Sequence, residues 1–394
     1  FSEAGLAQIR QGLERGIAAG IVPGAVGLID RGGQTEVFTV GTTEVGGTQP
    51  VQRDTIFRIA SMTKPIVAAA VMMLVDDGRL ALDEPVDRLL PELAERRVLR
   101  RIDAALHDTV AAERPITVED LLTLRLGFGQ ITEPSFDPPY PIVTTANSLD
   151  LVLGAPEPRT PWTPDEWMAR FGSLPMMDQA GVRWRYNVGT LVLGVLVARA
   201  AGAPLGEVLR ERVFAPLGMV DTGFATTPDQ LHRMPGQFLA GDGGEPVLQT
   251  HSQPEDYIVE PPFPSGSGGL LSTADDFLAF ARMLRNGGVH DGTRLLTADS
   301  VTAMTTNKLT AEQIGTGGML LGGQGWGYAI GVIISAAQPG MTPGQYGWSG
   351  GSGTTWFNDP SRDLIAIALT QTSDFLWNGG LAEFDALATA AVGD

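Results

Sequence analysis

The chain has no cysteine and only four histidines. Without cysteine there is no disulfide, no thiolate nucleophile and no cysteine zinc site, and the redox compartment stays undetermined. The histidines show no pair at metal-ligand spacing, and the HExxH motif is absent. Long apolar runs are missing too, since the longest, residues 66–75, is about half of the ~20 residues needed to cross a bilayer. We therefore expect no metal, no organic cofactor and no membrane association.

Positive charge is also scarce. The sequence has 27 Lys and Arg against 45 Asp and Glu, which gives a formal net charge of −18. Such a surface repels phosphates, so nucleic acid is excluded as a partner. Only Lys64 and Lys308 are lysines, and Lys64 stands among apolar residues, where an exposed lysine would be unusual. This setting makes Lys64 a candidate for chemistry.

The length of 394 residues favours two structural units. Strand-like runs near both ends enclose a long, mostly helical middle, which predicts an α/β (α+β) fold with an antiparallel sheet flanked by helices and a mostly helical second domain. We assign residues 1–60 and 265–394 to the sheet domain and residues 61–264 to the helical domain. Nine prolines between 128 and 182 break any periodicity there, so we expect a loop region acting as a lid over the substrate.

Hydrophobic periodicity and turn residues predict the main elements. We expect helices over residues 3–19, 61–77 and 381–392, and strands over residues 25–29, 35–40, 329–334, 353–357 and 364–369. Thr117 with Asp120, and Ser272 with Asp275, have the spacing of helix N-terminal capping pairs. In the lid region the aromatic residues that we expect to line the substrate are Phe136, Tyr140, Trp162 and Trp167.

The first chemical motif is Ser61-Met62-Thr63-Lys64. Residues three apart on a helix share one face, so the two side chains can meet. A serine hydroxyl needs a base, and a lysine can serve when burial lowers its pKa. The helix N-terminus also favours a developing alkoxide on Ser61. A capping serine followed by a surface lysine is the competing interpretation.

The residues around this motif, from Phe57 to Lys64, resemble the nucleophile motif of serine β-lactamases, penicillin-binding proteins and family VIII carboxylesterases. The resemblance implies a β-lactamase-like fold and a tyrosine that opens a later helix. Trp184-Arg185-Tyr186-Asn187-Val188-Gly189 fits that element and is closer to the esterase branch than to the Tyr-x-Asn form of class C β-lactamases. Tyr186 is therefore the third candidate catalytic residue, beside Ser61 and Lys64.

The resemblance also implies a strand opposite the nucleophile. Trp348-Ser349-Gly350-Gly351 stands where β-lactamases have Lys-Thr-Gly, with Trp348 in place of the lysine. We expect Trp348, Gly350 and Gly351 to form the oxyanion and substrate strand, with the backbone N–H of Gly351 joining that of Ser61 in an oxyanion hole.

These residues predict a serine hydrolase that cleaves carboxylic esters, with short acyl chains, through an acyl-enzyme on Ser61. Whether Lys64 or Tyr186 is the formal base stays open. Trp348 offers an apolar wall where a β-lactam carboxylate would need a cation, which favours esters. The alternatives are a β-lactamase or D-Ala-D-Ala peptidase, an acyltransferase or amidase on the same scaffold, and a non-catalytic binding module. We expect a monomer or small homo-oligomer that binds a small ester or amide, with the cytoplasm favoured and the periplasm or secretion left open.

Overall fold

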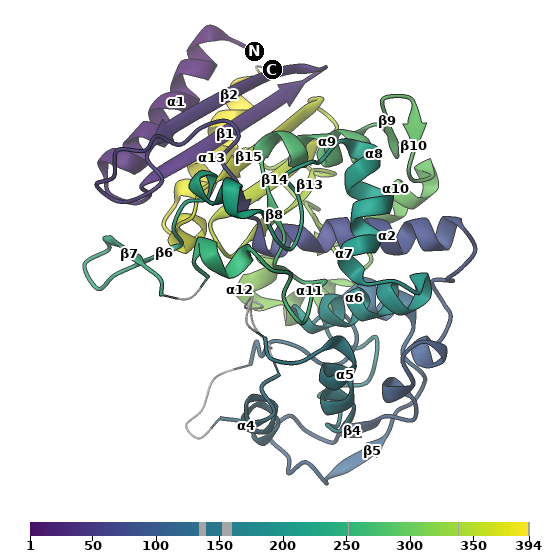
Figure 1. The fold of residues 1–394 in the computed structure, drawn as a ribbon. Helices are drawn as coiled ribbons and strands as arrows, with labels where there is room; N and C mark the ends of the chain where they lie inside the picture. Colours follow the sequence, from purple (N-terminus) through teal and green to yellow (C-terminus); the bar gives the residue numbers. More distant parts are fainter. Residues whose placement is uncertain (134–138, 152–159, 251, 338, 393–394) are drawn as a thin grey trace.

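The computed structural model describes residues 1–133, 139–151, 160–250, 252–337 and 339–392. At its centre is a seven-stranded antiparallel sheet in the order β11-β12-β13-β14-β15-β1-β2 (Figure 1). The strands come from both ends of the chain: β1 (Gly24–Arg31), β2 (Gln34–Gly41), β11 (Gly325–Trp326), β12 (Gly331–Val332), β13 (Tyr346–Gly350), β14 (Thr354–Asp359) and β15 (Leu364–Leu369). The expected antiparallel sheet flanked by helices is thereby confirmed.

Both faces of the sheet are covered. Alternate residues of a strand point to opposite faces. Ala25 and Ile29 of β1 pack with the two terminal helices, α1 (Glu3–Ala18) and α13 (Gly380–Ala390). Val26 and Leu28 belong to the larger core, which includes α2 (Thr63–Asp76) and α9 (Ala274–Arg285). The chain termini meet above the outer face, where the Ser2 N–H donates to the carbonyl of Ala391.

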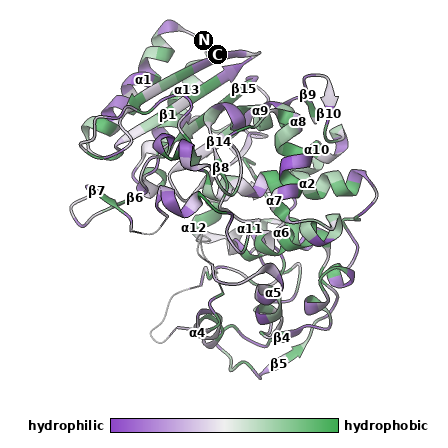
Figure 2. Ribbon diagram, in the orientation of Figure 1, coloured by the Kyte–Doolittle hydropathy of each residue, from purple (hydrophilic) through white to green (hydrophobic). Residues whose placement is uncertain are grey.

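The helix α2 is the buried axis of the molecule. It lies between the sheet and α6 (Val188–Ala201), and its residues from Thr63 to Leu74 are buried. Both helices are strongly apolar in Figure 2, as expected for helices enclosed on all sides. A 3₁₀ turn, η1 (Ala60–Met62), precedes α2 and carries Ser61, and Gly78 ends α2 with a φ of +70°. The predicted helix over 61–77 therefore exists, with a tighter first turn.

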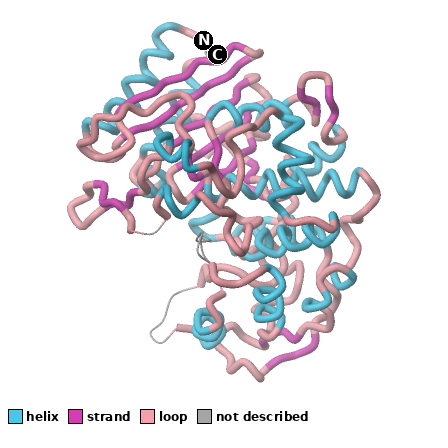
Figure 3. Tube along the Cα trace, in the orientation of Figure 1, coloured by secondary structure: helices cyan, strands magenta, loops and turns pink. Residues whose placement is uncertain are grey.

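The remaining elements are short and lie outside the seven-stranded sheet (Figure 3). The helices are α3 (Val118–Leu122), α4 (Pro141–Ser148), α5 (Pro164–Gly172), α7 (Leu205–Leu209), α8 (Ala215–Leu217), α10 (Ala298–Met304), α11 (Ala311–Thr316) and α12 (Gly318–Leu321). The two-stranded pairs are β3 (Phe57–Arg58) with β8 (Leu271–Ser272), β4 (Arg97–Leu99) with β5 (Thr109–Ala111), β6 (Phe238–Ala240) with β7 (Pro246–Leu248), and β9 (Val289–His290) with β10 (Thr293–Arg294). The domain boundaries given above stay a prediction.

Two local expectations need correction. The capping pair before α9 is Thr273 with Asp276, because the Thr273 hydroxyl accepts from the Asp276 N–H; Ser272 is still in β8. The strand expected over 329–334 is reduced to β12, since Ala329 has a φ of +55°, which no extended strand allows. The capping box of Thr117 and Asp120 is present as predicted.

In the described part of the chain no single helix is both long and apolar enough to cross a membrane. Among the described helices, Val188–Ala201 and Leu205–Leu217 reach that length and composition only when taken together, and they are bent by 78° against each other.

Candidate active site

Ser61 is held at the start of the buried helix by backbone contacts to the sheet. The residue before it, Ala60, has a φ of +43°, a conformation that costs energy for any residue except glycine. Ile59 is locked in place because its carbonyl accepts from the Thr354 hydroxyl and its N–H donates to the carbonyl of Leu270. This strained turn, supported from β14 and the segment before β8, presents Ser61 to a cavity that it lines.

Lys64 lies one turn further on and points back at the serine. Its Nζ is 2.9 Å from Ser61 Oγ and donates to the Ser267 carbonyl at 2.6 Å. The same atom lies 4.5 Å from the centre of the Tyr186 ring. The side chain has no solvent exposure. No acidic side chain within the described ranges forms an ion pair with it, so only the Ser61 hydroxyl, the Ser267 carbonyl and the face of the Tyr186 ring offset the loss of hydration there.

Burial sets the protonation state of Lys64. Removing an ammonium group from water disfavours its charged form, and this desolvation holds the pKa of Lys64 well below its usual 10.5. A neutral amine keeps two hydrogens and one lone pair. One hydrogen is used on the Ser267 carbonyl, which leaves the lone pair able to accept the hydroxyl proton of Ser61.

Tyr186 completes the cluster from a strained turn before α6. Asn187 has φ +81° and ψ −58°, and the Val188 N–H donates to the Tyr186 carbonyl at 3.2 Å, which together define a γ-turn. The Gln130 N–H donates to the same carbonyl at 3.0 Å. The phenol is therefore positioned by backbone geometry, in a region where rare dihedral angles accompany function.

The phenol oxygen accepts a hydrogen bond from Trp348 Nε1 at 2.8 Å and is also hydrogen-bonded to Ser61. Burial raises the pKa of Tyr186 to about 12, although both hydrogen bonds act in the opposite direction. Indole N–H is a donor only. Trp348 thus occupies a lone pair of the phenol and leaves its O–H free to donate toward the nucleophile. Trp184 and Trp326 pack around the two rings and keep them fixed.

The strand predicted opposite the nucleophile is β13, which carries Trp348 and ends at Gly350. A Cβ on Gly350 would overlap the Ile59 carbonyl and the Thr354 hydroxyl, so only glycine lets this strand approach the nucleophile turn so closely. Gly351 follows the strand, and a Cβ there would meet open space. Gly351 and Ser61 line the same cavity. The structure thus brings together the predicted residues Ser61, Lys64, Tyr186, Trp348, Gly350 and Gly351, whose catalytic roles stay a prediction.

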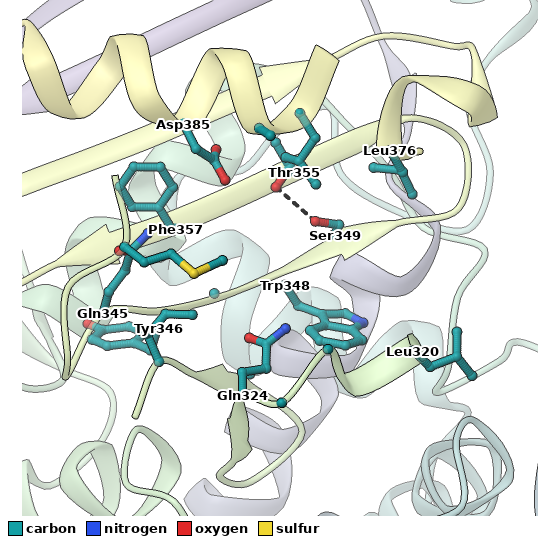
Figure 4. A pocket seen from close by; sticks show the side chains of 18 of the residues that line it. Leu320, Gln324, Gln345, Tyr346, Trp348, Ser349, Thr355, Phe357, Leu376 and Asp385 are labelled. Carbon is teal, nitrogen blue, oxygen red and sulfur yellow. Dashed lines mark hydrogen bonds between the residues drawn. The ribbon is translucent and has the colours of Figure 1, made fainter. Parts of the chain in front are cut away.

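The cavity has a volume of about 630 Å³ and continues from Ser61 and Trp348 past β13 to α13. Figure 4 shows Trp348 and Gln324 on one side of the strand, with Ser349, Thr355 and Asp385 on the other. Ser349 and Thr355 hydrogen-bond each other at 2.9 Å. Of the described residues that line the cavity, none is Lys, Arg or His, and Asp385 is the only acidic one. The described residues also hold no group of His, Asp and Glu suited to a metal ion.

The aromatic residues expected to line the substrate in the lid region do not border this cavity where the structure describes them. Trp167 is buried against Phe171 and Phe263, and Tyr140 is buried in the same core. Trp162 lies under the guanidinium of Arg170. None of the three lines the cavity. Among the described residues between 128 and 182, only Gln130 lines it. Phe136 lies outside the described residues.

Sequence reasoning missed two groups. Ser267 contributes a backbone carbonyl, which leaves no signature in residue type, although the small residues Ser265-Gly266-Ser267 mark a close approach: a Cβ on Gly266 would overlap the Thr190 carbonyl of α6. Asp385 lies in the last helix, more than 300 residues from Ser61. Nothing in the sequence distinguishes it from any other acidic residue of a helix. Only the fold shows that it borders the cavity.

Comparison with known proteins agrees with this geometry. The chain matches the Beta-lactamase family over residues 9–390. An uncharacterized protein of Mycobacterium tuberculosis is 38% identical over 362 residues, which cover 90% of this chain and 86% of that protein. Esterase EstB of Burkholderia gladioli is 33% identical over 368 residues, or 89% and 86% of the two chains. The solved structure of EstCE1, a hydrolase with promiscuous acyltransferase activity, has the same fold, with a TM-score of 0.81 at 24% identity over 99% of each chain. The protein therefore belongs to the β-lactamase family.

Proposed function

We propose that the protein is a carboxylesterase that hydrolyses esters with short acyl chains through an acyl-enzyme on Ser61. The observation that carries the proposal is the buried amine of Lys64, 2.9 Å from Ser61 Oγ, at a cavity whose described lining has no basic residue. A Ser–Lys pair of this kind activates a nucleophile without a histidine. Esterase EstB, at 33% identity, supports the same reaction class.

The protonation states of Lys64 and Tyr186 assign their roles as base and acid. Lys64 is the base, because its pKa is lowered and its lone pair faces Ser61, whereas Tyr186 keeps its proton up to about pH 12. As Ser61 Oγ attacks the ester carbonyl, its proton passes to Lys64. The developing oxyanion rests on the backbone N–H groups of Ser61 and Gly351. Tyr186 then donates its proton to the departing alkoxide and regains one from Lys64, and water releases the acyl group by the reverse route.

The cavity favours neutral esters over β-lactams. A β-lactam carries a carboxylate, which needs a cation to offset its desolvation. The described lining offers instead the indole of Trp348 and the carboxyl group of Asp385, the second of which repels an anion. A β-lactamase or peptidase activity on this scaffold is therefore the weaker candidate.

An acyltransferase reaction is the second candidate, and the cavity size favours it. A volume of about 630 Å³ suits a drug-sized ligand and exceeds what a short acyl group fills. An alcohol acceptor in the remaining space would compete with water for the acyl-enzyme. Added short-chain alcohols would then divert product from free acid to a new ester, which gas chromatography separates.

The test compares wild type with Ser61→Ala on p-nitrophenyl butyrate and on a chromogenic cephalosporin. The proposal predicts rapid release of p-nitrophenol by the wild type, none above background by the variant, and little cleavage of the cephalosporin. Cephalosporin turnover that exceeds ester turnover would move the protein to the penicillin-recognising branch. Silence on both substrates would favour a transferase, a narrow amidase or a binding role.

A further inference from the structure

The wall of the cavity on the α13 side carries a carboxyl group that makes no hydrogen bond within the described part of the chain. Asp385 Oδ1 is sealed from solvent and has no donor there. Figure 4 shows the carboxyl group of Asp385 on the side of β13 that also carries Ser349 and Thr355, and all three residues line the cavity. The nearby acid of the same helix, Glu383, behaves differently, because it is exposed and paired with Arg15 of α1.

An unpaired buried carboxyl group is costly. Native structures supply hydrogen-bond donors to nearly all buried polar groups, and a charged group without a partner shifts its pKa instead. Burial indeed raises the pKa of Asp385 to about 7. A perturbed acid at the edge of a cavity is typical of a functional group rather than a structural one. Asn at this position would avoid the cost, and no donor among the described residues offsets the charge.

We propose that Asp385 is the cation-accepting end of a specificity subsite, and that the substrates include esters carrying an ammonium group away from the reacting carbonyl. This inference rests on the proposed esterase function, because it places the subsite and Ser61 in one cavity. Asp385 supplies the missing counter-charge, and the ligand's cation supplies the partner that the carboxylate lacks. Asp385 acts in binding and takes no part in bond making.

The surroundings suit a cation. Phe357 and the exposed Trp377 line the same cavity as Asp385, and aromatic faces attract ammonium groups. In the described lining no Lys, Arg or His competes for the carboxylate. The overall charge of −18 adds a long-range attraction for cations and a repulsion for anions.

The experiment varies charge alone. One series consists of p-nitrophenyl esters of ω-(trimethylammonio)alkanoic acids with increasing numbers of methylene groups, each matched with the ester that ends in a tert-butyl group of the same shape. A second pair places the cation on the alcohol side: choline butyrate and 3,3-dimethylbutyl butyrate, followed by pH-stat titration. Quaternary ammonium groups do not titrate and cannot cyclise. Wild type, Asp385→Asn and the control Glu383→Gln are assayed at pH 8, above the pKa of Asp385.

The expected result is a preference for the cationic member of about tenfold or more in kcat/KM at the best spacer length, the size of one charge-assisted contact. In Asp385→Asn the ratio of kcat/KM between the cationic and the neutral member falls to near one. Glu383→Gln keeps the wild-type ratio. A wild-type ratio near one at every spacer length and on both sides of the ester, or a ratio that survives in Asp385→Asn, overturns the inference.

Failure of the subsite and failure of the esterase function are distinguishable. If the neutral esters turn over through Ser61 but charge has no effect, only the subsite is refuted. If no ester turns over, the proposed function is refuted, and calorimetric titration decides the subsite. For that measurement Ser61→Ala and Ser61→Ala/Asp385→Asn are titrated with choline butyrate and with its neutral match. Tighter binding of the cation that disappears in the double variant supports the subsite, and equal binding of the two esters contradicts it.

Discussion

Replacing Asp385 by Asn should stabilise the protein, and more so as the pH rises. The pKa of this carboxyl group is about 7 in the folded chain against a usual 3.8, because burial penalises its charge. Between these values the folded state holds a proton that the unfolded state has lost, so unfolding free energy falls with rising pH. The full difference of about three pKa units corresponds to about 4 kcal/mol. Asn has nearly the same shape and never ionises, so the unfolding free energy of the variant does not fall with rising pH for this reason.

The pH range of this effect follows from the same two pKa values. At pH 5 part of the penalty is already present in the wild type, and above pH 7 it is complete. The stability advantage of Asp385→Asn should therefore grow by roughly 2–3 kcal/mol between pH 5 and pH 8. Urea denaturation followed by tryptophan fluorescence at several pH values measures it. Glu383→Gln, on the same helix but exposed, should change stability by less than about 1 kcal/mol. A difference between wild type and Asp385→Asn that is flat with pH would refute the reasoning, since the carboxylate would then be hydrated or paired.

Three further predictions concern the reaction and the packing around the nucleophile. With neutral substrates kcat/KM should rise with pH as Lys64 loses its proton, and it should level off well below pH 10.5. Tyr186 keeps its proton in this range, so no decline should follow up to about pH 11. A rise that continues to pH 10.5 would contradict the lowered pKa of Lys64. Tyr186→Phe should lower kcat by about 10²–10⁴-fold. Trp348→Phe, which removes the N–H donor to Tyr186 and part of the ring that packs on Trp326, should lower it by about tenfold; a loss as large as that of Tyr186→Phe would contradict a merely assisting role of Trp348. Gly350→Ala should lower the unfolding free energy by about 1–3 kcal/mol because its Cβ overlaps the Ile59 carbonyl, whereas Gly351→Ala, which faces open space, should stay within about 0.5 kcal/mol of wild type in urea denaturation.

Local signals in the sequence predicted the elements that local physics decides. The strand predicted over 364–369 coincides with β15. Its continuous run of Leu, Ile and Ala is typical of a strand that is buried on both faces of a sheet. The Thr117 capping box and the Gly78 stop of α2 likewise depend on neighbouring residues only. The cap of α9 was misplaced by one residue because Ser272 and Thr273 are both good caps, and the pairing of β8 with β3 decides between them.

Features that depend on tertiary contacts escaped prediction. Trp162 and Trp167 were expected to contact the substrate because they lie in a Pro-rich segment. Trp167 instead packs in the larger hydrophobic core, against Phe171. The carbonyl of Ser267 and the carboxyl of Asp385 reach the site through the fold, and neither has a motif that marks it. The Ser61–Lys64 spacing did predict a meeting of the two side chains, since three residues make about one helical turn.

The central claim is that Ser61 carries the acyl group, and trapping that intermediate tests it most directly. Wild type and Ser61→Ala are mixed with p-nitrophenyl butyrate, quenched in acid within the first turnover, digested with trypsin and mapped by mass spectrometry. Arg58 and Arg79 bound the peptide that contains the nucleophile. The account predicts that this peptide gains the mass of one butyryl group, located on Ser61, in the wild type and not in the variant. Butyryl on another residue, or ester cleavage that persists in Ser61→Ala, would contradict it.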